Sequence, residues 1–179
     1  MENFGTIRIS ESAEILFYVD SFKGKQYANI RKFVRSRKYT GPTKSGVKLS
    51  KEELQAISDS LQNLSAEIQD VEESVLCESH KYIGKFIRVS IHYFNGTFGI
   101  DIREFFDTTK YKGPSKAGVR IPYSYLEDTR SCLKYMIAKL GDGPADSLFY
   151  SGQKKPEEVQ GNQKLDNTEG VPDEYGRFF

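Results

Sequence analysis

The sequence predicts an α+β fold made of two copies of one unit, in which several strands are followed by a helix. Three observations support this prediction. The chain repeats itself at an interval of 72 residues, each copy has segments that alternate between apolar and polar residues, and each copy ends in apolar residues at helical spacing. With 179 residues and 37% hydrophobic residues, the chain can bury a core.

The repeat is clearest where Asn29–Leu49 aligns with Asp101–Ile121 without a gap. Ten of these 21 positions are identical. They include a glycine-proline motif, which reads "KYTGPTKSGVKL" in the first copy and "KYKGPSKAGVRI" in the second. A self-match of this length is not chance, so the two copies should fold alike. We expect the first unit over residues 1–76 and the second over residues 77–141.

Each unit begins with strands. "EILFYVD" and "KFIRVSIHYF" are rich in β-branched and aromatic residues, and "FKGK" and "FNGT" predict tight turns, because glycine accepts positive φ. The next segments alternate, which places Ile30 and Ile102 on one face of each sheet and Arg31 and Arg103 on the other. We expect the glycine-proline motif to form a loop that leads into a short strand.

The glycine-proline motif has the spacing of a nucleotide-binding loop but lacks its chemistry. A Walker loop needs a lysine and then a hydroxyl after its second glycine. Here "VKL" follows Gly46 and "VRI" follows Gly118, so no hydroxyl stands after the basic residue. We therefore do not expect nucleotide binding at this motif.

The helices are predicted from caps and apolar spacing. Ser50 and Glu53 form a capping box at the first helix. Its apolar seam predicts a long helix of about seven turns, and it consists of Leu54, Ile57, Leu61, Leu64, Ile68, Val71 and Val75. The second helix begins at Pro122, and its seam consists of Leu126, Thr129, Leu133, Met136 and Leu140. We expect the two seams to bury each other.

Composition excludes several classes of protein. Cys77 and Cys132 have no metal-binding spacing and are expected to be reduced thiols, and His80 and His92 are isolated. No run of about 18 apolar residues indicates a membrane span, and the first ten residues contain no signal-peptide core. We expect an intracellular protein (in the cytoplasm or nucleoid, or in an infected host cell), with no cofactor, metal or membrane.

Charge is segregated along the chain, although the net charge is only +1. Residues 1–50 carry +6 and residues 81–120 carry +5, whereas residues 51–80 carry −7. Two basic blocks in a nearly neutral protein indicate a local surface that binds polyanions.

Two stretches, "SFKGKQYANIRKF" and "YIGKFIRVSIHYFNGTFGIDIREFF", resemble the core of the Positive Cofactor Four (PC4) family of transcriptional coactivators. So do the glycine-proline motif and the helix after it. The resemblance covers about residues 14–68 and 81–140. The string from Phe94 to Phe105 is a specific match, and the first copy departs from it at Asn29 and Lys32.

The resemblance implies a curved sheet of four antiparallel strands plus one helix per unit, units that pair across their helices, and binding of single-stranded nucleic acid without catalysis. Because both units lie on one chain, we expect an intrachain pseudo-dimer. Larger assemblies stay open. The residues agree with this expectation, since single-strand binding requires cations for the backbone and aromatic rings for the bases.

The residues that we expect to bind DNA are aromatic or basic and lie in or near the repeated segments. In the first unit they are Phe22, Lys23, Lys25, Arg31, Lys38, Tyr39, Lys44 and Lys48. In the second unit they are Phe94, Arg103, Phe106, Lys110, Tyr111, Lys116 and Arg120. Alternatives stay open: the tyrosines could pack within the loops, and the arginines of the strands could pair with acids of their own sheet. Phe33 and Phe105 are expected to pack rather than stack on bases.

Residues 142–179 differ in composition, carry a net charge of −4 and are expected to be a disordered acidic tail. The tail ends in "DEYGRFF", which resembles the tails of bacterial and phage replicative single-stranded-DNA-binding proteins. Such tails recruit replication partners and compete with DNA for the basic groove. The candidate partner-binding residues are Asp173, Glu174, Tyr175, Phe178 and Phe179. The alternative is a solubilising tail without a partner.

The sequence therefore predicts a single-stranded-DNA-binding protein without sequence specificity, acting in replication, recombination or repair. One alternative is a DNA-binding protein of the transcriptional coactivator type. Another is a protein-interaction scaffold whose basic sheet binds an acidic protein. We do not expect an enzyme, because no carboxylate pair, nucleophile–base pair or metal-binding set recurs in both units.

Overall fold

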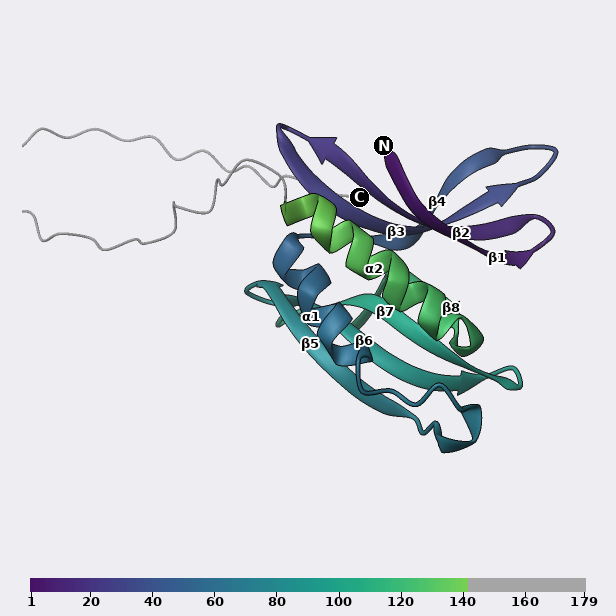
Figure 1. The fold of residues 1–179 in the computed structure, drawn as a ribbon. Coiled ribbons are helices and arrows are strands. Elements are labelled where there is room, and N and C mark those ends of the chain that lie inside the picture. Colours follow the sequence, from purple (N-terminus) through teal and green to yellow (C-terminus); the bar gives the residue numbers. More distant parts are fainter. Residues whose placement is uncertain (142–179) are drawn as a thin grey trace, which may run out of the picture. The chain divides into compact units, whose positions relative to one another are not determined.

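A computed structural model describes residues 1–141, so the tail and the disorder expected for it lie outside the described residues. The two repeats fall within one compact unit. Each repeat contains a four-stranded antiparallel sheet followed by a helix, which confirms the predicted fold class (Figure 1).

The elements follow the same order in both repeats. The first repeat consists of β1 (Glu2–Ser10), β2 (Ala13–Phe22), β3 (Lys25–Arg35), β4 (Thr40–Leu49) and α1 (Lys51–Leu61). A short turn, η1 (Ile68–Asp70), leads to β5 (Ser74–Tyr82), β6 (Lys85–Phe94), β7 (Thr97–Asp107), β8 (Lys112–Pro122), η2 (Tyr123–Tyr125) and α2 (Leu126–Gly141). In each sheet the strands are hydrogen-bonded in chain order. The first strand of each repeat, β1 or β5, was not predicted from the residues themselves.

The tight turns between β2 and β3 and between β6 and β7 are confirmed. Lys23 and Gly24 have φ of 52° and 77°, and Asn95 and Gly96 have φ of 49° and 79°. Two consecutive positive φ values characterise a type I′ turn, whose twist matches that of the adjoining strands.

The glycine-proline motif does not form the expected loop. It lies inside β4 in the first repeat and inside β8 in the second, where its backbone pairs with β3 or β7. The pairing is irregular at the motif, because the strand register shifts between Arg31 and Phe33. Gly41 and Gly113 have φ of 154° and 151°, values that a residue with a side chain rarely adopts. The motif is therefore an irregular strand that needs glycine.

The first helix is shorter than predicted. The capping box of Ser50 and Glu53 is present, but α1 ends at Leu61 after about three turns. Beyond it, Leu64 and Val71 still pack against the core, whereas Val75 is exposed in β5. The apolar residues that predicted one continuous helix thus lie partly in α1, partly in the connecting segment and partly in β5. Because β5 begins at Ser74, this strand starts ahead of the expected boundary at residue 77.

The end of α1 is held by Arg130 of α2. The Arg130 guanidinium donates hydrogen bonds to the carbonyl oxygens of Leu61 (2.5 Å), Gln62 (3.0 Å) and Leu64 (2.8 Å). The last carbonyls of a helix have no donor within the helix, and a cation there also interacts favourably with the helix dipole. Arg130 therefore stabilises the point at which the chain leaves α1 and turns toward β5.

Each helix packs against the sheet of the other repeat. The second helix, α2, packs against β1, β2 and β3 of the first sheet, and α1 contacts β5 and β6 of the second as well as its own β3 and β4. The two helices also pack against each other, as predicted (Figure 1). The buried residues of the predicted seams are Leu54, Ile57 and Leu61 in α1 and Leu126, Thr129, Leu133 and Met136 in α2. Neither repeat has a complete core without the helix of the other.

No helix among the described residues has both the length and the apolar composition that a membrane span requires. Within residues 1–141, no group of three His, Cys, Asp or Glu side chains is placed to hold a metal ion.

The packing of α2 on β1 depends on Gly5, which lies at an irregularity in the register of β1. A Cβ atom at Gly5 would overlap the sulfur of Cys132 and would lie 3.6 Å from its Cβ atom, an ordinary contact. Burial, and then the charge of Asp128, raise the pKa of the Cys132 thiol. The position thus requires glycine because a thiol occupies the space beside it.

We expect Gly5→Ala to reduce the free energy of unfolding by about 1–3 kcal/mol, the usual cost of overpacking. Adding Cys132→Ala removes the sulfur, so the double variant should be more stable than the sum of the two single effects implies. Thermal unfolding followed by circular dichroism measures all three variants. Independent, additive effects would contradict the contact.

Candidate nucleic-acid interface

Each sheet has one face toward the helices and an opposite face, called here the outer face, which carries Arg31 in the first repeat and Arg103 in the second. The register of β2 and β3 separates the two faces of the first sheet. Phe17 pairs with Ile30 on the helix side, where both are fully buried, and Leu16 pairs with Arg31 on the outer face. The alternation predicted for Ile30 and Arg31 is therefore present.

The outer face of the first sheet presents a lysine between two aromatic rings. Lys48 Nζ lies 4.3 Å from the centre of the Phe22 ring and 3.9 Å from that of Tyr27. Lys23 Nζ is 5.6 Å from the Phe22 ring, and Lys25 pairs with Phe22 beside the turn. Phe22 is 56% exposed. Four of the predicted residues are thus brought together, with an exposed ring that a base could stack on.

The second sheet builds the corresponding cluster differently. Phe94 is 62% exposed, and the Arg120 guanidinium lies 5.8 Å from its ring centre. Arg120 Nη2 donates hydrogen bonds to the carbonyl oxygens of His92 (2.8 Å) and Thr97 (3.0 Å). Gly99 stands where the first repeat has Tyr27, and a Cβ atom there would lie 2.7 Å from Arg120 Nε. An arginine over a glycine thus replaces a lysine over a tyrosine.

Arg31 and Arg103 lie flat across the neighbouring strand, because glycine stands beneath each. A Cβ atom at Gly46 would lie 2.8 Å from Arg31 Cγ, and one at Gly118 would lie 2.7 Å from Arg103 Cζ. Nη1 of Arg31 donates to the carbonyl oxygen of Thr43 at 2.8 Å. Arg103 makes the equivalent bond to Ser115 at 3.2 Å. The repeated glycines therefore position the repeated arginines.

The two arginines differ in charge balance. Arg103 Nε lies 3.1 Å from Asp101 Oδ1, whereas the residue at the corresponding position beside Arg31 is the neutral Asn29. The alternative in which these arginines pair with acids of their own sheet is thus correct for Arg103 and not for Arg31.

The sequence did not indicate three further side chains of the outer faces, namely Arg88, Phe86 and Tyr27. The Arg88 guanidinium lies 4.2 Å from the ring centre of Phe105 and 5.5 Å from that of Phe86, and these two rings stack at 5.6 Å. Tyr27 is the third. Strict alternation from Arg31 would have found Tyr27, but Arg88 has no signal in the repeat, since its counterpart is Leu16.

Comparison with known proteins identifies the family. Residues 9–60 and 81–128 match the family model described as Transcriptional Coactivator p15 (PC4). The chain belongs to the PC4 family. The matched segments begin 72 residues apart, so each PC4 repeat supplies one match. No curated protein matches the chain.

Solved structures show looser similarity. BPSL1147, a PC4 homolog from Burkholderia pseudomallei, has 16% identity and a TM-score of 0.34 over 40% of this chain and 95% of that chain. WHY3 from Arabidopsis thaliana has 7% identity and a TM-score of 0.40 over 77% and 88%. The plant transcriptional regulator PBF-2 has 10% identity and a TM-score of 0.38 over 84% and 88%.

The repeated tyrosines of this PC4 protein have a structural contact. Tyr39 donates its hydroxyl hydrogen to the carbonyl oxygen of Pro42 at 2.5 Å, and Tyr111 does the same to Pro114 at 2.8 Å. Both side chains are half exposed, so the contact leaves part of each ring accessible. Lys38, Lys44, Lys110 and Lys116 are exposed in or beside the same segments.

Phe106 lies on the other side of the sheet from Phe94, Arg103 and Arg120. It pairs with Lys85 on the helix-facing side of β7, and its ring makes an edge contact with Tyr111 at 6.3 Å. Lys85 Nζ lies 2.7 Å from Glu104 Oε2. Burial lowers the pKa of Lys85, but the hydrogen bond and charge of Glu104, with a smaller effect of Tyr82, raise it overall.

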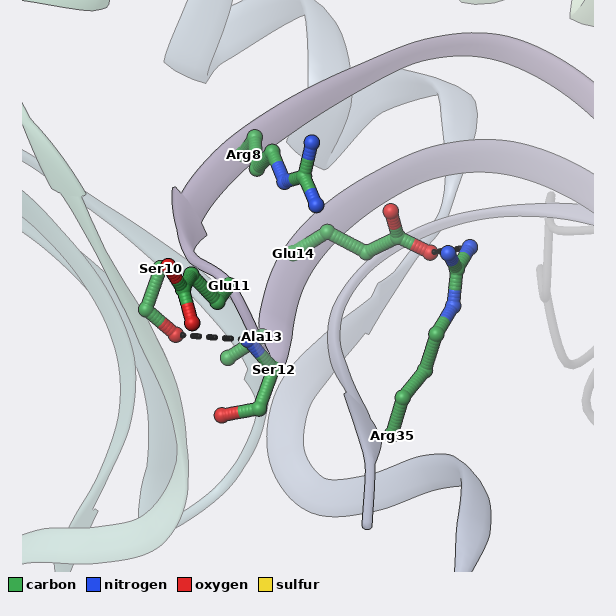
Figure 2. A pocket seen from close by; sticks show the side chains of 7 residues that line it. All are labelled: Arg8, Ser10, Glu11, Ser12, Ala13, Glu14 and Arg35. Carbon is green, nitrogen blue, oxygen red and sulfur yellow. Dashed lines mark hydrogen bonds and ion pairs between the residues drawn. The ribbon is translucent and has the colours of Figure 1, made fainter.

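A small hollow marks the β1–β2 turn, where Arg8, Glu14 and Arg35 meet (Figure 2). Arg35 Nη2 lies 2.7 Å from Glu14 Oε1. The hollow has a volume of about 10 Å³, which suits one water molecule and no larger ligand. The two arginines of its lining are balanced by Glu11 and Glu14, so the hollow forms neither a binding pocket nor a basic patch.

We expect removal of the carboxylate beside Arg103 to increase the affinity for single-stranded DNA. Asp101→Asn copies the Asn29 of the first repeat and frees Arg103 from its counter-charge. Binding of a single-stranded oligonucleotide should tighten by roughly twofold to fivefold, since one charge interaction at a partly exposed site is worth about 1 kcal/mol.

Fluorescence anisotropy at low salt measures this change. Asp128→Asn, on the exposed first turn of α2, alters the net charge equally and serves as the control. Equal gains from the two variants would show that net charge, and not Arg103, is responsible.

Proposed function

We propose that the chain is a non-enzymatic protein that binds single-stranded DNA without reading its sequence. One observation carries the proposal: exposed rings with cations beside them recur on the outer faces of both sheets. Lys48 lies beside Phe22 in the first repeat, and Arg120 lies beside Phe94 in the second. The cations suit phosphates and the rings suit bases.

Single strands fit this surface better than a duplex. Exposed rings such as Phe22 and Phe94 can stack on unpaired bases, each stack being worth about 1–3 kcal/mol. In a duplex the faces of the bases are already covered by neighbouring base pairs. The elements that would enter a major groove, α1 and α2, instead pack between the sheets.

We further propose that the protein acts in replication, recombination or repair, with residues 173–179 of the tail contacting protein partners. The family description supports a second candidate, a transcriptional coactivator that acts on promoter DNA. The two roles differ in partner. A replication role requires binding that depends on strand length alone, whereas a coactivator role requires a polymerase or transcription factor.

We expect the protein to bind an oligonucleotide of about 20 nucleotides at least about tenfold more tightly as a single strand than as a duplex, equivalent to one stacked base. The logarithm of affinity should fall with the logarithm of salt concentration, with a slope near −0.7 for each phosphate neutralised. Fluorescence anisotropy at several salt concentrations measures both quantities. Equal or tighter binding of duplex would contradict the proposal, and loss of all binding at modest salt would favour the protein scaffold.

We expect removal of residues 142–179 to leave the melting temperature unchanged and to tighten binding of single strands. The segment carries a net charge of −4, which competes with DNA for the basic faces. The gain should shrink as salt rises, because screening weakens both attractions. Asp173→Asn with Glu174→Gln should reproduce part of the gain. Weaker binding by the shortened chain would show that basic or aromatic residues of the tail contact the strand.

A further inference from the structure

A crevice lies between the repeats, where β8 passes the first sheet. Its volume is about 210 Å³. This is smaller than the roughly 300–1,000 Å³ of drug-sized pockets but leaves room for a phosphate or a sugar-phosphate. The lining includes Ile9, Lys32 and Ser45 from the first repeat and Arg103, Gly118 and Arg120 from the second.

The lining of the crevice carries positive charge and no acidic residue. Arg103 and Arg120 already have hydrogen-bond partners. Lys32 is half-buried and forms no ion pair with any residue in 1–141. It pairs with Ile15, on the helix-facing side of the first sheet. An unpaired ammonium group in a partly enclosed space favours an anion from outside the chain.

The pseudo-equivalent position, found by shifting each residue by 72, is closed. Lys81 replaces Ile9 there, and Glu104 replaces Lys32. Lys81 Nζ donates to the carbonyl oxygen of Lys48 at 2.6 Å and lies 3.3 Å from Glu104 Oε1. The Lys81 and Glu104 side chains are only 16% and 12% exposed, so they fill the space.

The two junctions therefore differ in both shape and charge. At the closed junction, Lys81 fills the gap, and both Lys81 and Lys85 pair with Glu104. At the open junction, the short Ile9 leaves the gap empty, and Lys32 stands where the acid would be. The repeat symmetry is broken where a strand would pass from one sheet to the other.

We propose that the open junction binds a backbone phosphate of the single strand, at the point where the strand crosses from the second sheet to the first. The inference rests on the proposed function. Arg103 and Arg120 belong both to the outer face of the second sheet and to the crevice lining, so the two surfaces are continuous. Because the other junction is closed, a strand that spans both repeats follows one path.

The test compares two lengths of oligothymidine, about 20 nucleotides to span both repeats and about 6 nucleotides to occupy one sheet. Lys32→Gln should weaken binding of the long strand about threefold to tenfold and reduce its salt slope by about 0.7, the effect of one lost phosphate contact. The short strand should bind as it does to the unaltered chain. Lys32→Arg keeps the charge and should retain most of the long-strand affinity.

Lys134→Gln, on an exposed position of α2, removes the same charge and is the control. Melting temperatures verify that each variant is folded. If Lys32→Gln is not folded, Ser45→Asp replaces it, because an acid at this exposed position of the crevice lining should also weaken binding of the long strand only. Wild-type affinity in Lys32→Gln would overturn the inference while leaving single-strand binding intact. Equal losses for both lengths, or for Lys134→Gln, would overturn it too. If the unaltered chain binds neither strand, the proposed function itself fails.

Discussion

The structure depends on the burial of α1 and α2 against each other and against the opposite sheets. Leu61 in the first repeat and Leu133 in the second have no exposed surface. Each would be open to water if its own repeat stood alone. A helix exposing such a seam is unfavourable by roughly 1.5–3 kcal/mol for each large side chain. The exchange also has a geometric effect. Since the helices occupy the inner faces, each sheet has its outer face free for a ligand.

The free faces are alike in plan and different in detail. Arg31 and Arg103 each lie over a glycine at the equivalent position of the neighbouring strand, but only Arg103 pairs with an acid. A lysine between two rings in the first sheet becomes an arginine over a glycine in the second. At the junctions, the equivalent positions 32 and 104 carry opposite charges, a lysine and a glutamate. A homodimer of one PC4 unit could not carry these differences, whereas two units on one chain can diverge while the shared core is kept.

Much of the fold could be predicted because its signals are local or repeated. The capping box at Ser50, the type I′ turns and the alternation around Arg31 each depend on a few neighbouring residues. The identity of Gly46 with Gly118 reflects a contact that occurs in both repeats. The repeat also predicted most members of the outer-face clusters. These signals share one property, that the physical cause lies close in the sequence or recurs at the interval of 72 residues.

The features that escaped prediction depend on distant contacts. The end of α1 is stabilised by Arg130, which is 69 residues away from Leu61 in the chain, so no local pattern indicates this contact. The exchange of helices between sheets involves apolar faces that would look the same if each helix covered its own sheet. The cluster around Arg88 occurs in one repeat only. The crevice at Lys32 exists because the Ile9 side chain does not fill the space beside it. The sequence has no pattern that indicates such an unfilled space.

The most direct test of the account is to find where the DNA lies. Ultraviolet crosslinking of one oligothymidine strand to the full chain, followed by mass spectrometry of the crosslinked peptides, maps the contact to individual residues. The account predicts adducts on outer-face rings of both repeats, at Phe22 or Tyr27 and at Phe94, within complexes of one chain and one strand. Adducts confined to one repeat, or to the helix-facing sides of the strands, would contradict it.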